Sequence, residues 1–129
     1  DWVDIGGLKL VPSDKFTPEF GYNAIRVPLY LALSRNALRV KKAADFSTLR
    51  GFADPRGPSV TQIVTGEPSV MGGIGFRAIA ALTRCMDKAE PFPSELLQIG
   101  TDDYYSTTLQ IFTILAIAER YPQCLSPEW

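Results

Sequence analysis

The stretch "FGYNAIRVPLYLAL", Phe20–Leu33, is the most informative part of this sequence for its fold. It places a phenol, an amide and a guanidinium, at Tyr22, Asn23 and Arg26, where an otherwise almost wholly apolar segment begins. Residues three or four positions apart share one face of a helix, so these three side chains gather at its N-terminal end. Free backbone N–H groups and a positive potential at that end favour an oxygen-rich ligand or an ordered water.

The helix itself is expected from about Ala24 to Ser34. Pro28 falls early in it and removes one helical hydrogen bond, so the start should be kinked or irregular. A plainer interpretation stays open, in which Asn23 is only the N-cap and Arg26 is only a structural ion-pair partner.

Composition excludes several classes of function. The chain has 129 residues, of which 46% are hydrophobic, which is enough for the core of one domain. The net charge is −1, which argues against nucleic acid as a partner. There is no histidine, so Ser-His and Cys-His nucleophiles and imidazole metal ligands are excluded, and we expect no metal and no cofactor. The longest apolar stretch, around Leu109 to Ala118, is too short to span a bilayer.

The two cysteines, Cys85 and Cys124, lie far apart in the sequence. Cys85 falls in an apolar helical segment, so we expect it to be a core thiol. Two cysteines neither demand nor exclude a disulfide, and the redox compartment stays open.

The remaining elements are helices, turns and a short β-hairpin. A looping start is expected over residues 1–21, helices over 36–49, 74–88 and 103–120, a strand or hairpin in "SVTQIVTG" and a short turn or helix in "PFPSELLQI". The four glycines from Gly66 to Gly75 match neither a phosphate loop nor a dinucleotide fingerprint. We interpret them as a tight loop that leads into the helix at Ile74.

A second group of polar and aromatic residues, "TDDYYSTT" at Thr101–Thr108, also begins an apolar helix. Tyr104 and Tyr105 are suited to stacking against sugar rings, although amphipathic packing explains them equally well. Asp102 and Asp103 are expected to be capping charges rather than catalytic carboxylates.

The helices over 24–34 and 103–120 are apolar nearly all round, which is typical of helices enclosed on every side. A chain with about four helices can hardly enclose two of them. We therefore expect the rest of the wall to come from outside this sequence, which begins without methionine and suggests a processed product or a piece of a longer protein.

The order of these pieces resembles the C-terminal part of glycoside hydrolase family 8, in particular the bacterial cellulases encoded alongside cellulose synthase. The resemblance runs from Trp2 to about Arg120, through "GYNAIRVPLYLAL", "VTGE", "GGIGFRAIAAL" and "DYYSTTLQIF". Its most specific element is Tyr22–Val27. The fold that it implies is mainly α, with residues 1–129 forming the C-terminal portion of a single α/α six-hairpin barrel that carries a short β-hairpin insertion.

The resemblance also implies an inverting endo-β-1,4-glucanase, or cellulase, that is periplasmic or secreted and acts on β-1,4-glucan. This chain would supply the water-side half of the cleft. The general acid of the family is a glutamate near the N-terminus, outside this chain. We therefore expect the chain alone to be inactive and its partner to be the N-terminal part of the same protein, covalent or as a separate chain. The alternatives are an inactive carbohydrate-binding or scaffold fragment and an unrelated helical interaction domain.

The resemblance assigns roles to individual residues. Asn23 stands at the position of the general base, which is an aspartate in many relatives. Tyr22 and Arg26 would position the water and the sugar. Tyr104 and Tyr105 would line the cleft, and Phe76 would pack near it.

An amide at position 23 cannot accept the proton of the attacking water, although it can orient that water. Either another carboxylate is the base, or Asn23 is an engineered change, or the assignment of this position is wrong. We favour the first explanation, and the candidates within this chain are Glu19, Asp103 and Glu67.

Overall fold

The computed structural model describes residues 3–6, 9–34, 52, 54 and 57–125. The elements are β1 (Val3–Gly6), β2 (Lys9–Pro12), β3 (Glu19–Phe20), α1 (Arg26–Leu33), β4 (Ser59–Gln62), β5 (Pro68–Val70), α3 (Ile74–Lys88), the 3₁₀ turn η2 (Ser94–Leu97), α4 (Tyr104–Arg120) and the 3₁₀ turn η3 (Pro122–Cys124). The helix predicted over 36–49 lies outside the described residues.

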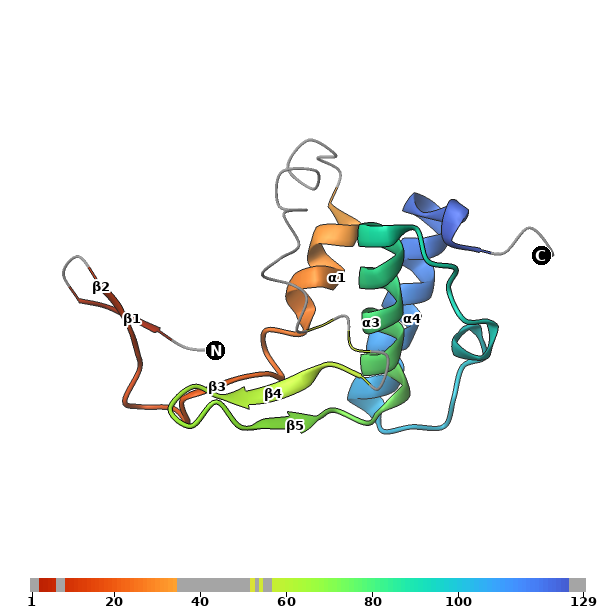
Figure 1. Cartoon of the computed structure of the whole chain (residues 1–129). Helices are drawn as coiled ribbons and strands as arrows, with labels where there is room; N and C mark the ends of the chain where they lie inside the picture. Colours follow the sequence, from red (N-terminus) through yellow and green to blue (C-terminus); the bar gives the residue numbers. More distant parts are fainter. Residues whose placement is uncertain (1–2, 7–8, 35–51, 53, 55–56, 126–129) are drawn as a thin grey trace.

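The three helices run side by side in the same direction, and their N-terminal ends lie toward the small sheet (Figure 1). Because α3 and α4 point the same way, the chain returns between them along a connection that contains η2 (Figure 1). The starts of α1, α3 and α4 therefore lie at one end of the helical layer.

The core lies between these helices. Ile79 and Leu82 of α3 are fully buried, and Met86 packs against the core at its edge. The other helices contribute smaller and branched apolar side chains to the same core, namely Leu29, Ala32, Leu109, Ala116 and Ile117. The prediction of a mainly α fold with a short β-hairpin is confirmed for the described residues.

The start of α1 is irregular, as predicted. Turns precede the helix, held by a hydrogen bond from the N–H of Ile25 to the carbonyl of Gly21 at 2.9 Å. Pro28 then falls in the first turn, where its missing N–H has no helical partner to lose. The expectation that Pro28 removes a helical hydrogen bond is therefore wrong. The N-cap is Ile25, which makes no side-chain capping bond, so the interpretation of Asn23 as the N-cap is wrong.

The small sheet has the antiparallel order β3-β4-β5. The hairpin predicted in "SVTQIVTG" is confirmed, with Ser59 opposite Val70 and Thr61 opposite Pro68. A second hairpin, β1–β2, pairs Val3 with Pro12 where only a looping start was expected. The signals in the sequence are the alternation of Val3, Asp4 and Ile5 and the apolar pair Leu10 and Val11, and both are too short to predict strands among the nearby glycines and prolines.

Both helices that were expected to be enclosed keep one face uncovered by the described residues. On α1, Val27 and Tyr30 are exposed, and on α4 the exposed residues are Ile111, Phe112 and Leu115. The described residues thus form a layer of helices and not a closed barrel (Figure 1). No helix in this part of the chain has the length and apolar character needed to cross a membrane.

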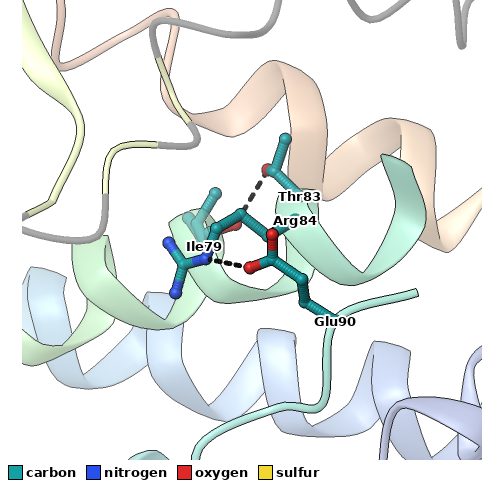
Figure 2. Close-up of polar contacts among 4 residues, drawn as sticks. All are labelled: Ile79, Thr83, Arg84 and Glu90. Carbon is teal, nitrogen blue, oxygen red and sulfur yellow. Dashed lines mark hydrogen bonds and ion pairs between the residues drawn. The ribbon is translucent and has the colours of Figure 1, made fainter. Parts of the chain in front are cut away.

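The C-terminal end of α3 is closed by a covalent bond and an ion pair. Cys85 forms a disulfide with Cys124 in η3, so the expectation of a free core thiol is wrong, although both residues are buried. One residue earlier, the Nε of Arg84 lies 3.1 Å from a carboxylate oxygen of Glu90 (Figure 2). Ala89 ends the helix in the left-handed region at φ 55°.

Candidate active site

At the start of α1, Arg26 is hydrogen-bonded to Asn23. Its Nη2 donates to the side-chain oxygen of Asn23 at 2.8 Å, and its Nε donates to the backbone oxygen of the same residue at 3.4 Å. The guanidinium thus holds the side-chain amide of Asn23 through one contact and the backbone of the same residue through the other. The partner of Arg26 in these contacts is a neutral amide and not the carboxylate of the ion pair considered above.

A row of three aromatic rings crosses the ends of all three helices. Tyr22 meets Phe76 of α3 edge to face with ring centroids 5.8 Å apart, and Phe76 meets Tyr105 of α4 at 6.0 Å. Phe76 is buried, whereas half of the Tyr22 surface is exposed. Phe76 therefore packs between the two tyrosines, and its expected place near a cleft stays a prediction.

Tyr105 also ties α4 to the turns before α1. Its hydroxyl donates to the backbone oxygen of Tyr22 at 2.9 Å. Burial raises the pKa of Tyr105, the positive charge of Arg26 works against that shift, and Tyr30 adds to it. The phenol therefore stays protonated at neutral pH and can serve as this donor. The sequence reasoning missed Tyr30 as a neighbour of Tyr105, since no local spacing connects the two.

Tyr104 lies outside these contacts. Its side chain is 87% exposed, and its backbone oxygen accepts the hydroxyl of Thr108 at 2.7 Å. The predicted role of Tyr104 in lining a cleft stays a prediction.

The two aspartates before α4 cap two different helices. Asp103 is the N-cap of α4 and accepts from the N–H groups of Tyr105 and Ser106 at 2.9 and 3.0 Å. Asp102 instead accepts from the N–H of Ile74, the first residue of α3, at 2.6 Å. Both are capping charges, as predicted, but local sequence reasoning assigned Asp102 to the wrong helix.

Ser106 completes this junction, and the sequence reasoning missed it. Its buried hydroxyl donates to Asp102 and accepts from the N–H of Gly75, both at 2.9 Å. Gly75 belongs there because a Cβ at this position would overlap the backbone oxygen of Ser106. The first two amides of α3 are thus satisfied within the protein, which agrees with the interpretation of the glycines as a tight loop and not a phosphate site.

The three carboxylates that were candidates for the general base in place of Asn23 lie in different surroundings. Glu19 accepts from the side chain of Gln62 on the neighbouring strand at 3.3 Å. Glu67 is exposed beside the turn between β4 and β5. Asp103 has one carboxylate oxygen engaged in capping α4. Asp103 thereby contacts the backbone N–H of Tyr105, a residue of the aromatic row.

Solved structures of two other proteins are similar to this chain. The chain is similar to a GH8 endo-beta-1,4-glucanase from an Achatina fulica gut metagenomic library, with 28% identity and a TM-score of 0.53 over 87% of this chain. It is also similar to endoglucanase Cel10, a family 8 glycosyl hydrolase from Klebsiella pneumoniae, with 28% identity and a TM-score of 0.55 over 85% of this chain.

Comparisons with protein families and with curated sequences found no match. No protein-family model matches the chain, and neither does any curated protein sequence. The chain spans about a third, 34%, of the length of each of the two solved structures. The resemblance inferred from the sequence is confirmed: this chain is similar to a part of two endoglucanases of glycoside hydrolase family 8.

Proposed function

We propose that this chain forms the water-side half of the substrate cleft of an inverting endo-β-1,4-glucanase. The observation that carries the proposal is the cluster of Tyr22, Asn23 and Arg26 with Phe76 and Tyr105 at the converging helix starts. The same chain aligns with two family 8 endoglucanases, which supports a β-1,4-glucan as substrate.

Within this proposal, the exposed ring of Tyr22 offers a stacking surface for a glucosyl unit. The amide of Asn23, held by Arg26, offers a hydrogen bond to the attacking water. Inversion requires a protonated carboxylic acid for the leaving oxygen and a carboxylate for the water on the opposite face of the ring. Asn23 cannot take the proton, so a carboxylate elsewhere in the protein is the base, and the acid is supplied by a segment outside this chain.

The experiment is hydrolysis of carboxymethylcellulose by the full-length protein that carries this chain. We expect reducing ends to be released, the α-anomer to appear first in NMR spectra, and the 129-residue chain alone to be inactive. Arg26→Lys keeps the charge but loses the planar fork, so activity should fall about tenfold or more. Arg120→Lys, at the far end of α4, is the matched control and should leave activity unchanged. Absence of reducing ends from the full-length protein would contradict the proposal.

A second candidate is a carbohydrate-binding protein without catalysis. It is favoured by one observation, the amide at position 23 in place of a carboxylate. In that case the full-length protein binds cello-oligosaccharides without turnover, and Asn23→Asp, which adds a carboxylate beside Arg26, is the variant expected to gain hydrolysis.

The uncovered faces of α1 and α4 support a partner for this chain. Val27, Tyr30 and Phe112 are each between 45% and 61% exposed, which is costly for apolar and aromatic side chains in water. We propose that the N-terminal part of the same protein covers them. Protection of α1 and α4 amides from hydrogen exchange should then be stronger in the full-length protein than in the isolated chain.

We also propose that the protein is periplasmic or secreted. The disulfide between Cys85 and Cys124 supports this, because such bonds persist in oxidising compartments. Fractionation of the producing cells tests it, and recovery of the protein only in the cytoplasm would contradict it.

A further inference from the structure

Asp102 joins two helices at the mouth of the proposed cleft. Its Oδ2 accepts from the N–H of Ile74 at 2.6 Å and from the hydroxyl of Ser106 at 2.9 Å. Ile74 is the first residue of α3, and Ser106 lies in the first turn of α4. A single carboxylate oxygen therefore links the starts of both helices, and the proposed reaction gives this carboxylate no role.

Helix α3 depends on this link because its own N-cap is Gly73, which makes no side-chain capping bond. Its first two amides are satisfied from across the interface, Ile74 by Asp102 and Gly75 by the hydroxyl of Ser106. Removal of the Asp102 carboxylate would take one acceptor away from α3 and would also free the Ser106 hydroxyl to turn away from Gly75.

The link lies beside two rings of the aromatic row. Phe76 directly follows Gly75, and Tyr105 directly precedes Ser106. These two rings are 6.0 Å apart, and Phe76 also supports Tyr22. The separation of α3 and α4 at this point therefore sets where the rings stand relative to one another.

We propose that Asp102 is a positioning residue, which fixes the Tyr22–Phe76–Tyr105 row by tying the start of α3 to α4 and thereby sets the affinity for a β-1,4-glucan oligosaccharide. The identity of the ligand rests on the proposed function, whereas the positioning of the rings does not. Asp102 itself is a poor base, because hydrogen bonds from Ile74 and Ser106 hold its pKa below the usual value.

Three variants of the full-length protein test this role. Asp102→Ala removes the acceptor, and Asp102→Asn keeps an oxygen in its place without the charge. The control is Glu90→Ala, which breaks the ion pair with Arg84 at the opposite end of α3 (Figure 2). This control perturbs the same helix but leaves the aromatic row untouched.

The kinetic readout uses cellopentaose. We expect Asp102→Ala to raise KM about tenfold with little change in kcat, because the row contacts the sugar equally in the ground and transition states. Asp102→Asn should recover most of this loss, and Glu90→Ala should leave KM unchanged. A merely structural role would lower the fraction of folded enzyme, so kcat would fall at constant KM; that result, or an unchanged KM in Asp102→Ala, would overturn the proposal.

A second readout does not depend on the reaction. Near-ultraviolet circular dichroism reports the fixed packing of tyrosine rings, and we expect Asp102→Ala to weaken the tyrosine signal while Asp102→Asn and Glu90→Ala retain it. If the wild-type protein neither binds nor cleaves cellopentaose, the proposed function fails and this signal alone decides the positioning role. An unchanged signal in Asp102→Ala would then overturn it.

Discussion

The hydroxyl of Tyr105 donates a hydrogen bond to the backbone oxygen of Tyr22, 2.9 Å away and 83 residues earlier in the sequence. This bond connects the first turn of α4 to the turns before α1, and both residues belong to the aromatic row. It thereby connects the two groups of residues that the sequence predicted as site candidates.

The first prediction concerns this bond at alkaline pH. Because burial raises the pKa of Tyr105 in the folded state, the folded protein binds more protons than the unfolded chain above about pH 10. The stabilisation is therefore fully present below that pH and is lost as the pH rises through the folded-state pKa. Tyr105→Phe should cost about 1 kcal/mol of unfolding free energy at neutral pH and should reduce the alkaline loss.

Urea unfolding at a series of pH values measures this effect. Tyr121 needs a parallel variant, because burial raises its pKa as well. We expect Tyr105→Phe and Tyr121→Phe each to reduce the alkaline slope in part, and the double variant to reduce it further. An alkaline slope in Tyr105→Phe equal to that of the wild type would refute the assigned role of this hydroxyl.

The second prediction concerns the close contact of α3 and α4 at Gly75. A Cβ there would overlap the backbone oxygen of Ser106, and backbone cannot move aside as a flexible side chain can. Gly75→Ala should therefore separate the helices and cost about 1–3 kcal/mol. Gly72→Ala is the matched control, because a Cβ at Gly72 meets nothing within 4 Å. Equal unfolding midpoints for the two variants in urea would contradict the prediction.

The helices could be predicted because their signals are local. The apolar periodicity of α3 gave its bounds, Ile74–Lys88, and the pair Asp103 and Arg120 marked the two ends of α4. The contact between Asn23 and Arg26 could be predicted from their spacing of three residues. A hydrogen bond of 2.8 Å between their side chains confirms it.

The connections between elements could not be predicted because they join residues far apart in sequence. Asp102 caps a helix that begins 28 residues earlier, whereas local capping rules assign it to the helix that follows. The disulfide joins Cys85 to a cysteine 39 residues later, and its formation depends on how the connection between α3 and α4 returns. The buried Ser106 offered no sequence signal beyond its position near a helix start.

The third prediction concerns Gln110, a fully buried amide on α4. Its Nε2 donates to the backbone oxygens of Leu96 and Gln98 at 3.0 and 2.8 Å, and its Oε1 accepts from the N–H of Gly100 at 3.2 Å. This one side chain therefore holds the connection from η2 against the helix.

Gln110→Ala should leave these three backbone groups without their partner and should cost about 1–3 kcal/mol of unfolding free energy. Gln123→Ala, at an exposed position in η3, is the control and should stay within about 0.5 kcal/mol of the wild type. Hydrogen exchange of the Gly100 amide should also accelerate in Gln110→Ala. A slow, unchanged exchange at Gly100 would count against the proposed clamp.

The fourth prediction concerns the disulfide between Cys85 and Cys124, which closes a loop with a sequence separation of 39 residues. In the chain-entropy description, a loop of this length restricts the unfolded chain enough to stabilise the folded state by about 4 kcal/mol. The double variant Cys85→Ala/Cys124→Ala should lose about that much, measured by urea unfolding. Reductant should lower the midpoint of the wild type toward that of the double variant, whose own midpoint should not respond. Alkylation of both cysteines in denatured, unreduced protein would show that the bond does not form, and the stability difference would then have to come from packing alone.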